Sequence, residues 1–135
     1  MRQGGILSPS LFNIYIDVLI VRLRKMNFGC HIDNIFLGCL CYADDILLIS
    51  PSVSALQMML NICDDVGKEI AITFNPMKSS CIMFGSGYAK YNPSSMTLSN
   101  SELSWVKNLK YLGIIIKTGK VFDIDISQEE NFMLV

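Results

Sequence analysis

Apolar residues recur at helical spacing in two segments of the chain. In residues 8–26 they go almost all the way round the predicted helix, and only a narrow edge through Asn13, Asp17 and Arg24 is polar. Such a pattern is typical of a helix that is covered on two sides. In residues 51–69 the apolar positions lie on one face only, which predicts a helix packed on one face of a sheet.

Short apolar runs with β-branched and aromatic residues predict strands around these helices. Residues 35–50 are predicted to form two strands joined at Ala43-Asp44-Asp45, and residues 72–74 and 81–84 to form strands on either side of a turn at residues 75–78. Three more predicted strands form a small β unit: residues 96–98, 102–105 and 111–116. This order predicts an α+β fold with helices packed on one face of an antiparallel sheet.

The composition is unusually apolar for a chain that folds as one domain. Its 135 residues are 51% apolar and 17% charged, and the mean hydropathy is +0.41. These values predict either very complete burial or a surface that a neighbour covers. No apolar run reaches the roughly 18 residues of a membrane span, and the N-terminus lacks the apolar core of a signal peptide. We therefore expect an intracellular protein, in the cytoplasm or the nucleus, that is not secreted.

The charge distribution is uneven, although the net charge is only −1. That net charge by itself argues against a nucleic-acid binder. Residues 107–120 carry four lysines and no acid, whereas residues 121–135 carry four acids and no base. A solvated face explains each cluster equally well, so charge leaves nucleic-acid binding open.

The cysteines do not form a recognisable metal motif. Their number is odd, they show no paired zinc spacing, and His31 is the only histidine. We therefore predict buried free thiols rather than a Cys/His metal site. The five cysteines are Cys30, Cys39, Cys41, Cys63 and Cys81.

Two adjacent carboxylates, Asp44 and Asp45, interrupt a stretch that otherwise suits a protein core, CYADDILLIS. Like charges repel, and burying either one without a partner costs free energy. An exposed hairpin turn tolerates such a pair without any function, since Asp is common in turns. Apolar strands on both sides would also hold the carboxylates rigidly, as a hard cation such as Mg²⁺ requires. The pair alone leaves both interpretations open.

The wider set of motifs resembles the palm of a reverse transcriptase of LINE-type (non-LTR) retrotransposons. The segment RQGGILSPSLFNIYIDVL is followed by YADDILLIS, then by ITFNPMKSSCIMF and LKYLGIII, in the order and at the spacing of that family. The resemblance implies a partial palm domain over residues 1–116, in which the first catalytic strand and the fingers are missing. Residues 117–135 then form an acidic tail, interpreted as the start of a thumb.

This resemblance implies an RNA-directed DNA polymerase that uses two Mg²⁺ ions, with Mn²⁺ as an alternative, for nucleotidyl transfer in retrotransposition. The primer 3′-hydroxyl attacks the α-phosphate of a deoxynucleotide, and pyrophosphate leaves. The implied partners are an RNA template, a DNA primer and deoxynucleotides. For the isolated chain we expect little or no activity, and self-association through an exposed sheet edge.

The functional positions of the family match particular residues of this sequence. Asp44 and Asp45 match its metal-binding carboxylates, and Lys78 matches a lysine implied to protonate the departing pyrophosphate. Tyr42 matches a tyrosine near the primer end, and Tyr111, Leu112 and Gly113 match the turn near the primer strand. Phe12 also suits a core position, and Lys78 an ordinary exposed turn. The positions implied to contact nucleotide and template are Gln3, Gly4, Pro9 and Phe12.

One element of the family pattern is missing from this sequence. Such enzymes need a third carboxylate on a strand before the QGG segment, and neither Asp17 nor Asp33 matches its position. A non-enzymatic remnant of a retrotransposon, at most a weak nucleic-acid-binding or self-associating module, is therefore the main alternative. A palm-type nucleotidyl cyclase shares the sheet and the acidic tip but explains neither the SPSLF helix nor the YLG turn.

Overall fold

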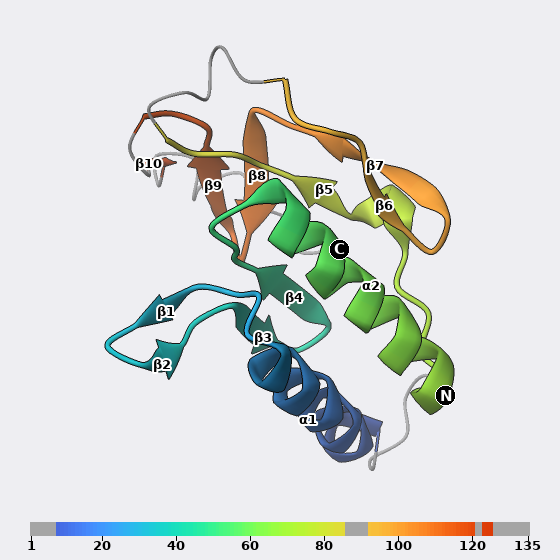
Figure 1. Cartoon of the computed structure of the whole chain (residues 1–135). Coiled ribbons are helices and arrows are strands. Elements are labelled where there is room, and N and C mark those ends of the chain that lie inside the picture. The colour runs from blue at the N-terminus through green and yellow to red at the C-terminus, as the bar shows by residue number, and fades with distance from the viewer. Residues whose placement is uncertain (1–7, 86–91, 121–122, 126–135) are drawn as a thin grey trace. The chain divides into compact units, whose positions relative to one another are not determined.

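The computed structural model describes residues 8–85, 92–120 and 123–125 (Figure 1). The chain divides into two compact units, residues 1–74 and residues 75–135, and each is described by itself. Helices and short, mainly antiparallel strands occur as separate elements along the chain, which confirms the predicted α+β class. Within the described residues, no helix combines the length and the apolar content that crossing a bilayer requires.

Two helices organise the described part of the first unit. Helix α1 spans Ser8–Met26, the predicted bounds, and α2 spans Val53–Ile70. Helix α2 begins two residues later than predicted because the Ser52 hydroxyl accepts a hydrogen bond of 3.2 Å from the backbone N–H of Ala55 and so caps the helix. At its other end α2 stops at Ala71, whose φ of 57° is left-handed.

Two hairpins lie between these helices in the sequence. Strands β3 (Cys39–Tyr42) and β4 (Asp45–Leu48) pair antiparallel, as predicted. The first predicted strand begins too early, because residues 35–36 belong to a hairpin of their own, in which β2 (Ile35–Phe36) pairs with β1 (His31–Ile32). Asp33 and Asn34 form its turn with φ angles of 47° and 66°, a conformation that short Asp and Asn side chains tolerate.

The predicted strand at residues 72–74 is wrong. The backbone N–H of Ile72 instead donates a hydrogen bond of 2.9 Å to the carbonyl oxygen of Gly67, which terminates α2. Phe74 then packs against the core of the first unit from an irregular segment. Ile72 and Phe74 are therefore half-buried without being part of a sheet.

The core of the first unit lies between α1, α2 and the β3–β4 hairpin (Figure 1). Leu19, Met59 and Val66 are fully buried in it. Among the α1 residues whose burial is described, one side is covered, contrary to the prediction, and Ile14 on the opposite side is 60% exposed. The buried members of this core are Ile16, Leu19, Leu23, Cys39, Met59, Ile62, Cys63 and Val66.

The second unit begins with a turn and a small mixed sheet. The turn predicted at residues 75–78 is the 3₁₀ helix η1 (Pro76–Lys78). Strand β7 pairs antiparallel with β6, across the predicted turn at Ser99 and Asn100, and parallel with β5. The predicted strand at 81–84 is shorter and earlier. The bounds are Ser80–Cys81 for β5, Met96–Leu98 for β6 and Ser101–Trp105 for β7.

A separate antiparallel sheet follows, in the order β10-β9-β8. The prediction of one strand over residues 111–116 is wrong, because Leu112 and Gly113 form a hairpin turn with φ angles of 49° and 81°. The chain therefore reverses at this point, and Tyr111 pairs with Ile114. The bounds are Asn108–Tyr111 for β8, Ile114–Lys117 for β9 and Asp123–Asp125 for β10.

Candidate active site

The two adjacent carboxylates lie at the tip of the β3–β4 hairpin. Tyr42 pairs with Asp45 across the hairpin, so Ala43 and Asp44 form its two-residue loop. Ala43 has a φ of 48°, which reverses the chain within this short loop. The structure thus holds Asp44 in the loop and Asp45 at the first position of β4.

The hairpin is anchored on one side only. Cys39 is buried, and Ile46 and Leu48 pack against the core shared with α1 and α2. The sequence suggested that the stretch before the carboxylates is buried, but Leu40 is 42% exposed and Tyr42 is 65% exposed. Both carboxylates are therefore presented to solvent from a strand pair whose other face is fixed to the core.

Asp44 and Asp45 are both exposed, and in the described part of the chain neither has an ion-pair partner. Their exposure explains how two like charges are tolerated side by side. Carboxylate oxygens are also the ligands that Mg²⁺ prefers, so the donor type fits that ion. Across the described residues no three His, Cys, Asp or Glu side chains come together as a metal site. The hairpin tip supplies two carboxylates and not a complete set of ligands.

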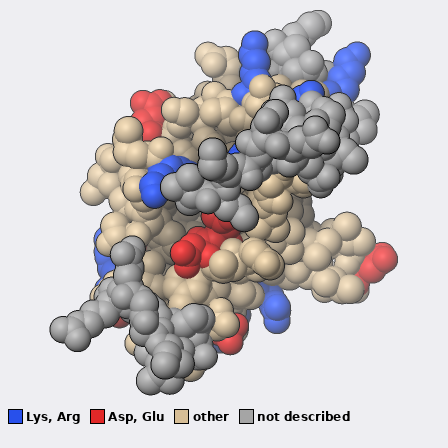
Figure 2. Space-filling view, turned by 180° about the vertical axis from the view of Figure 1, so that it is seen from behind, with Lys and Arg blue, Asp and Glu red and all other residues tan. Residues whose placement is uncertain are grey.

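The two acids that the sequence set aside belong to elements other than the β3–β4 hairpin. Asp17 is an exposed residue of α1, and Asp33 lies in the turn of the β1–β2 hairpin. On the face shown in Figure 2, acidic and basic side chains of the described residues are dispersed among other residues, and neither sign forms a continuous patch.

The positions carried over for nucleotide and template contacts lie at the start of the chain. Gln3 and Gly4 are outside the described residues, and Pro9 lies in the first turn of α1. Phe12 is half-buried and packs against the core of the first unit. Its side chain therefore has a structural role, whatever else it does.

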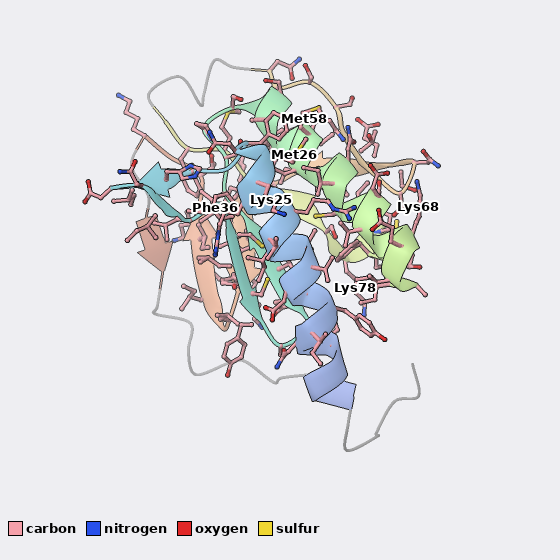
Figure 3. All side chains as sticks on the ribbon, turned by 60° about the horizontal axis from the view of Figure 1, so that its bottom comes forward. Lys25, Met26, Phe36, Met58, Lys68 and Lys78 are labelled. Atoms are coloured by element: carbon pink, nitrogen blue, oxygen red, sulfur yellow. The ribbon has the colours of Figure 1, made fainter. Side chains whose placement is uncertain are left out.

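Lys78 and the Tyr111–Gly113 turn belong to the second unit. Lys78 is exposed at the end of η1 (Figure 3). The Asn75 side chain fixes this turn, because its Oδ1 accepts a hydrogen bond of 2.9 Å from the backbone N–H of Met77. Tyr111 is half-buried at the end of β8, and Leu112 at the adjacent turn is 48% exposed.

The prediction of buried free thiols holds for Cys39, Cys63 and Cys81 but is wrong for Cys41, which is exposed, and for Cys30, which is half-buried. Cys39 and Cys41 lie on one face of β3, and their sulfur atoms are 3.6 Å apart. Their spacing of two residues on a predicted strand was the signal that could have found this pair. They lie on the strand that leads directly to the acidic tip.

The amino-acid sequence is similar to that of known proteins. Residues 1–116 match the family model described as reverse transcriptase (RNA-dependent DNA polymerase). The chain is 26% identical to the Retrovirus-related Pol polyprotein from the type-1 retrotransposable element R1 of Nasonia vitripennis, over 92% of this chain and 37% of that protein. It is 30% identical to the Pol polyprotein from the type-2 retrotransposable element R2DM of Drosophila melanogaster, over 90% of this chain and 12% of that protein.

A third relative agrees with these two. The chain is 29% identical to the Pol polyprotein from the type-1 retrotransposable element R2 of Nasonia vitripennis, over 85% of this chain. The match covers 12% of that relative. The chain thus spans a small part of the curated relatives that it matches.

Proposed function

The chain belongs to the reverse transcriptase (RNA-dependent DNA polymerase) family, and from this premise we propose that it is the palm part of an RNA-directed DNA polymerase of a non-LTR retrotransposon. The observation that carries the proposal is the acidic hairpin tip. Asp44 and Asp45 are exposed at a tight turn whose strands are fixed to a helical core. This is the kind of rigid support that a catalytic carboxylate needs.

In this proposal Asp44 and Asp45 bind Mg²⁺, or Mn²⁺ in its place. When bound, such an ion stabilises the charge that develops on the transferred phosphate. Exposure of both carboxylates keeps them accessible, and the left-handed Ala43 fixes the direction in which the loop presents Asp44. The ligand set is completed by a carboxylate from outside the described residues, since those residues hold no third ligand at the tip.

The remaining residues act on the substrates. Tyr42, which is 65% exposed beside Asp45, lies near the primer end. Lys78 protonates the departing pyrophosphate, for which an exposed ammonium on a capped turn is suited. The turn of Tyr111, Leu112 and Gly113 contacts the primer strand. The nucleotide and template contacts are assigned to Gln3, Gly4, Pro9 and Phe12.

The partners follow from this activity: an RNA template, a DNA primer and deoxynucleotides, in the cytoplasm or nucleus of a cell. We divide the chain into a palm part, residues 1–116, and an acidic tail, residues 117–135. The chain alone is expected to synthesise little DNA, because two carboxylates hold two cations poorly. Robust Mg²⁺-dependent primer extension on an RNA template by this chain would contradict that expectation.

A titration with Mn²⁺, followed by the electron paramagnetic resonance signal of the free ion, tests the metal site directly. We expect binding in the millimolar range that weakens about tenfold or more in Asp44→Asn and in Asp45→Asn, since each variant removes an anionic ligand. Asp33→Asn is the matched control, because Asp33 is an exposed turn acid of the neighbouring β1–β2 hairpin. Equal binding by all four proteins would overturn the proposed role of the hairpin tip.

A non-enzymatic remnant of a retrotransposon is the second candidate. The observation in its favour is that no three potential ligands gather among the described residues. Such a module would at most bind nucleic acid weakly or self-associate. It predicts no Mn²⁺ binding that depends on Asp44 or Asp45, so the same titration separates the two functions.

A further inference from the structure

Cys39 and Cys41 form a close pair of thiols on strand β3. They lie on the same face of the strand, and their sulfur atoms are 3.6 Å apart, within hydrogen-bonding range for sulfur. Cys39 is 9% exposed and belongs to the core of the first unit, whereas Cys41 is exposed. One sulfur is therefore open to reagents in solution, and the other lies directly behind it.

The two thiols differ in how readily they ionise. The hydrogen bond between the two sulfurs lowers the pKa of Cys41, although partial burial and the nearby Asp17 carboxylate oppose this effect. The same hydrogen bond, together with burial, raises the pKa of Cys39. Cys41 thus carries the greater thiolate character, and the thiolate is the nucleophilic form of cysteine.

A bond between the two sulfurs requires β3 to bend locally. Residues two apart on a strand have Cα atoms about 6.6 Å apart, close to the upper limit of about 6.8 Å for disulfides, and their Cβ atoms must come within about 4.5 Å of each other. The sulfur atoms would approach by roughly 1.5 Å to reach bonding distance. Rotation of the exposed Cys41 side chain supplies part of this movement.

We propose that Cys39 and Cys41 form an oxidation site, in which hydrogen peroxide converts the two thiols into a disulfide within strand β3. The Cys41 thiolate attacks one peroxide oxygen, the O–O bond breaks, and Cys41 becomes a sulfenic acid as water leaves. The Cys39 sulfur then attacks the Cys41 sulfur. The S–S bond forms, the S–O bond breaks, and the Cys39 proton leaves with the hydroxide as a second water. Two thiols are oxidised, and one peroxide is reduced to two waters.

The other cysteines lack this combination of access and a neighbouring thiol. Cys63 is 3% exposed, and its burial raises its pKa to about 12. Cys81 is buried in the second unit, and burial raises its pKa to about 11. Cys30 is half-buried in the segment between α1 and β1. The site is independent of the proposed polymerase function and requires only the folded hairpin.

The experiment is a peroxide pulse on the full, reduced chain, followed by alkylation with iodoacetamide and peptide mapping under non-reducing conditions. We expect the peptide that contains residues 39 and 41 to become two hydrogens lighter and to resist alkylation until it is reduced. Cys30→Ser, the matched control, should behave like the unsubstituted chain. Cys41→Ser changes an exposed side chain and should abolish the disulfide without unfolding the hairpin. In Cys39→Ser, the sulfenic acid of Cys41 should persist and react with dimedone.

Folding itself provides a second control. In the folded chain we expect iodoacetamide to alkylate Cys41 about tenfold faster than Cys30, and this preference should vanish in guanidinium chloride. The inference is overturned if Cys39 and Cys41 remain fully alkylatable after the pulse. It is also overturned if Cys41 pairs with Cys63 or with a second chain, or if Cys30 reacts as fast as Cys41.

Discussion

At the scale of single residues, the backbone conformation of Ala43 determines how the chain reverses at the acidic turn. Its φ of 48° places a residue with a Cβ in the left-handed region, which costs roughly 1–2 kcal/mol. This strain is maintained because β3 and β4 are paired over four residues on each side and fixed to the core. The turn is therefore held by its surroundings rather than by its own sequence.

Substitution of Ala43 measures this strain. Ala43→Val adds a β-branched side chain at a left-handed residue, and we expect a loss of about 1–2 kcal/mol in the free energy of unfolding. Ala43→Gly should be neutral or slightly stabilising, because glycine adopts positive φ without steric cost. Urea denaturation of the three proteins checks both outcomes. Equal stability of the valine variant and the parent chain would show that the turn is not strained.

At the scale of the element, the end of α2 depends on a glycine inside the helix. A Cβ built on Gly67 would lie 2.6 Å from the carbonyl oxygen of Ile72, an atom of the backbone that cannot move without disturbing the helix end. A hydrogen bond brings the two residues this close: the backbone N–H of Ile72 donates to the carbonyl oxygen of Gly67 at 2.9 Å. Close backbone contact, and not helix propensity, thus accounts for glycine at this position.

Gly67→Ala should therefore destabilise the protein by about 1–3 kcal/mol through overpacking, although alanine favours an isolated helix by about 1 kcal/mol. Ala71→Gly is the comparison variant at the same helix end. Ala71 has a φ of 57°, so glycine there should leave stability unchanged or raise it slightly. Thermal melts followed by circular dichroism compare the two. A stabilised Gly67→Ala protein would contradict the close contact.

The two helices of the first unit are also joined by an ion pair. The guanidinium of Arg22 in α1 donates to both carboxylate oxygens of Glu69 in α2, at 2.7 and 2.8 Å. The hydrogen bond and charge of Arg22 lower the pKa of Glu69. A lowered carboxylate pKa gives stability that is present above the pKa of the unfolded chain, about 4.3, and is lost as the pH falls through the folded value.

Glu69→Gln should consequently be slightly less stable than the parent chain at pH 7, and the difference should shrink at pH values below about 4.3. The effect is small because both side chains are largely solvated. Denaturation midpoints measured from pH 3 to pH 7 test this dependence. In an Arg22→Gln background the substitution of Glu69 should have no such pH dependence, and a persistent one would assign the effect to another group.

At the scale of the whole molecule, the described surface retains apolar side chains that the high apolar content anticipated. Ile14, Val18 and Val21 on the outer side of α1 are 60%, 41% and 46% exposed. Met58 of α2 and Met26 of α1, both labelled in Figure 3, are 43% and 50% exposed.

We expect the isolated chain to self-associate through such apolar surface or through unpaired strand edges. Light scattering over a concentration series should show a rising mean mass. The combined variant Val18→Glu and Val21→Lys should reduce it, whereas Asn13→Glu on the polar edge of the same helix should not. A chain that stays monomeric at high concentration would contradict the expectation, and an unchanged mass in the combined variant would assign association to another surface.

The sequence by itself determined the elements whose pattern is local. The spacing of apolar residues predicted the bounds of α1, and the acidic pair between apolar strands predicted the β3–β4 turn. Both predictions succeeded because each pattern lies within a few consecutive residues. The same motifs led to the family that the comparison then showed.

Tertiary structure decided what depends on distant partners. Long-range pairing and packing decided three features. Residues 35–36 pair with β1 rather than extend β3, residues 72–74 stay outside any sheet, and one side of α1 remains exposed. The contact between Cys39 and Cys41 likewise depends on the strand, because only an extended backbone places both side chains on one face. The type and spacing of apolar residues indicate which side chains favour burial. Which surface covers them is determined only when the elements pack together.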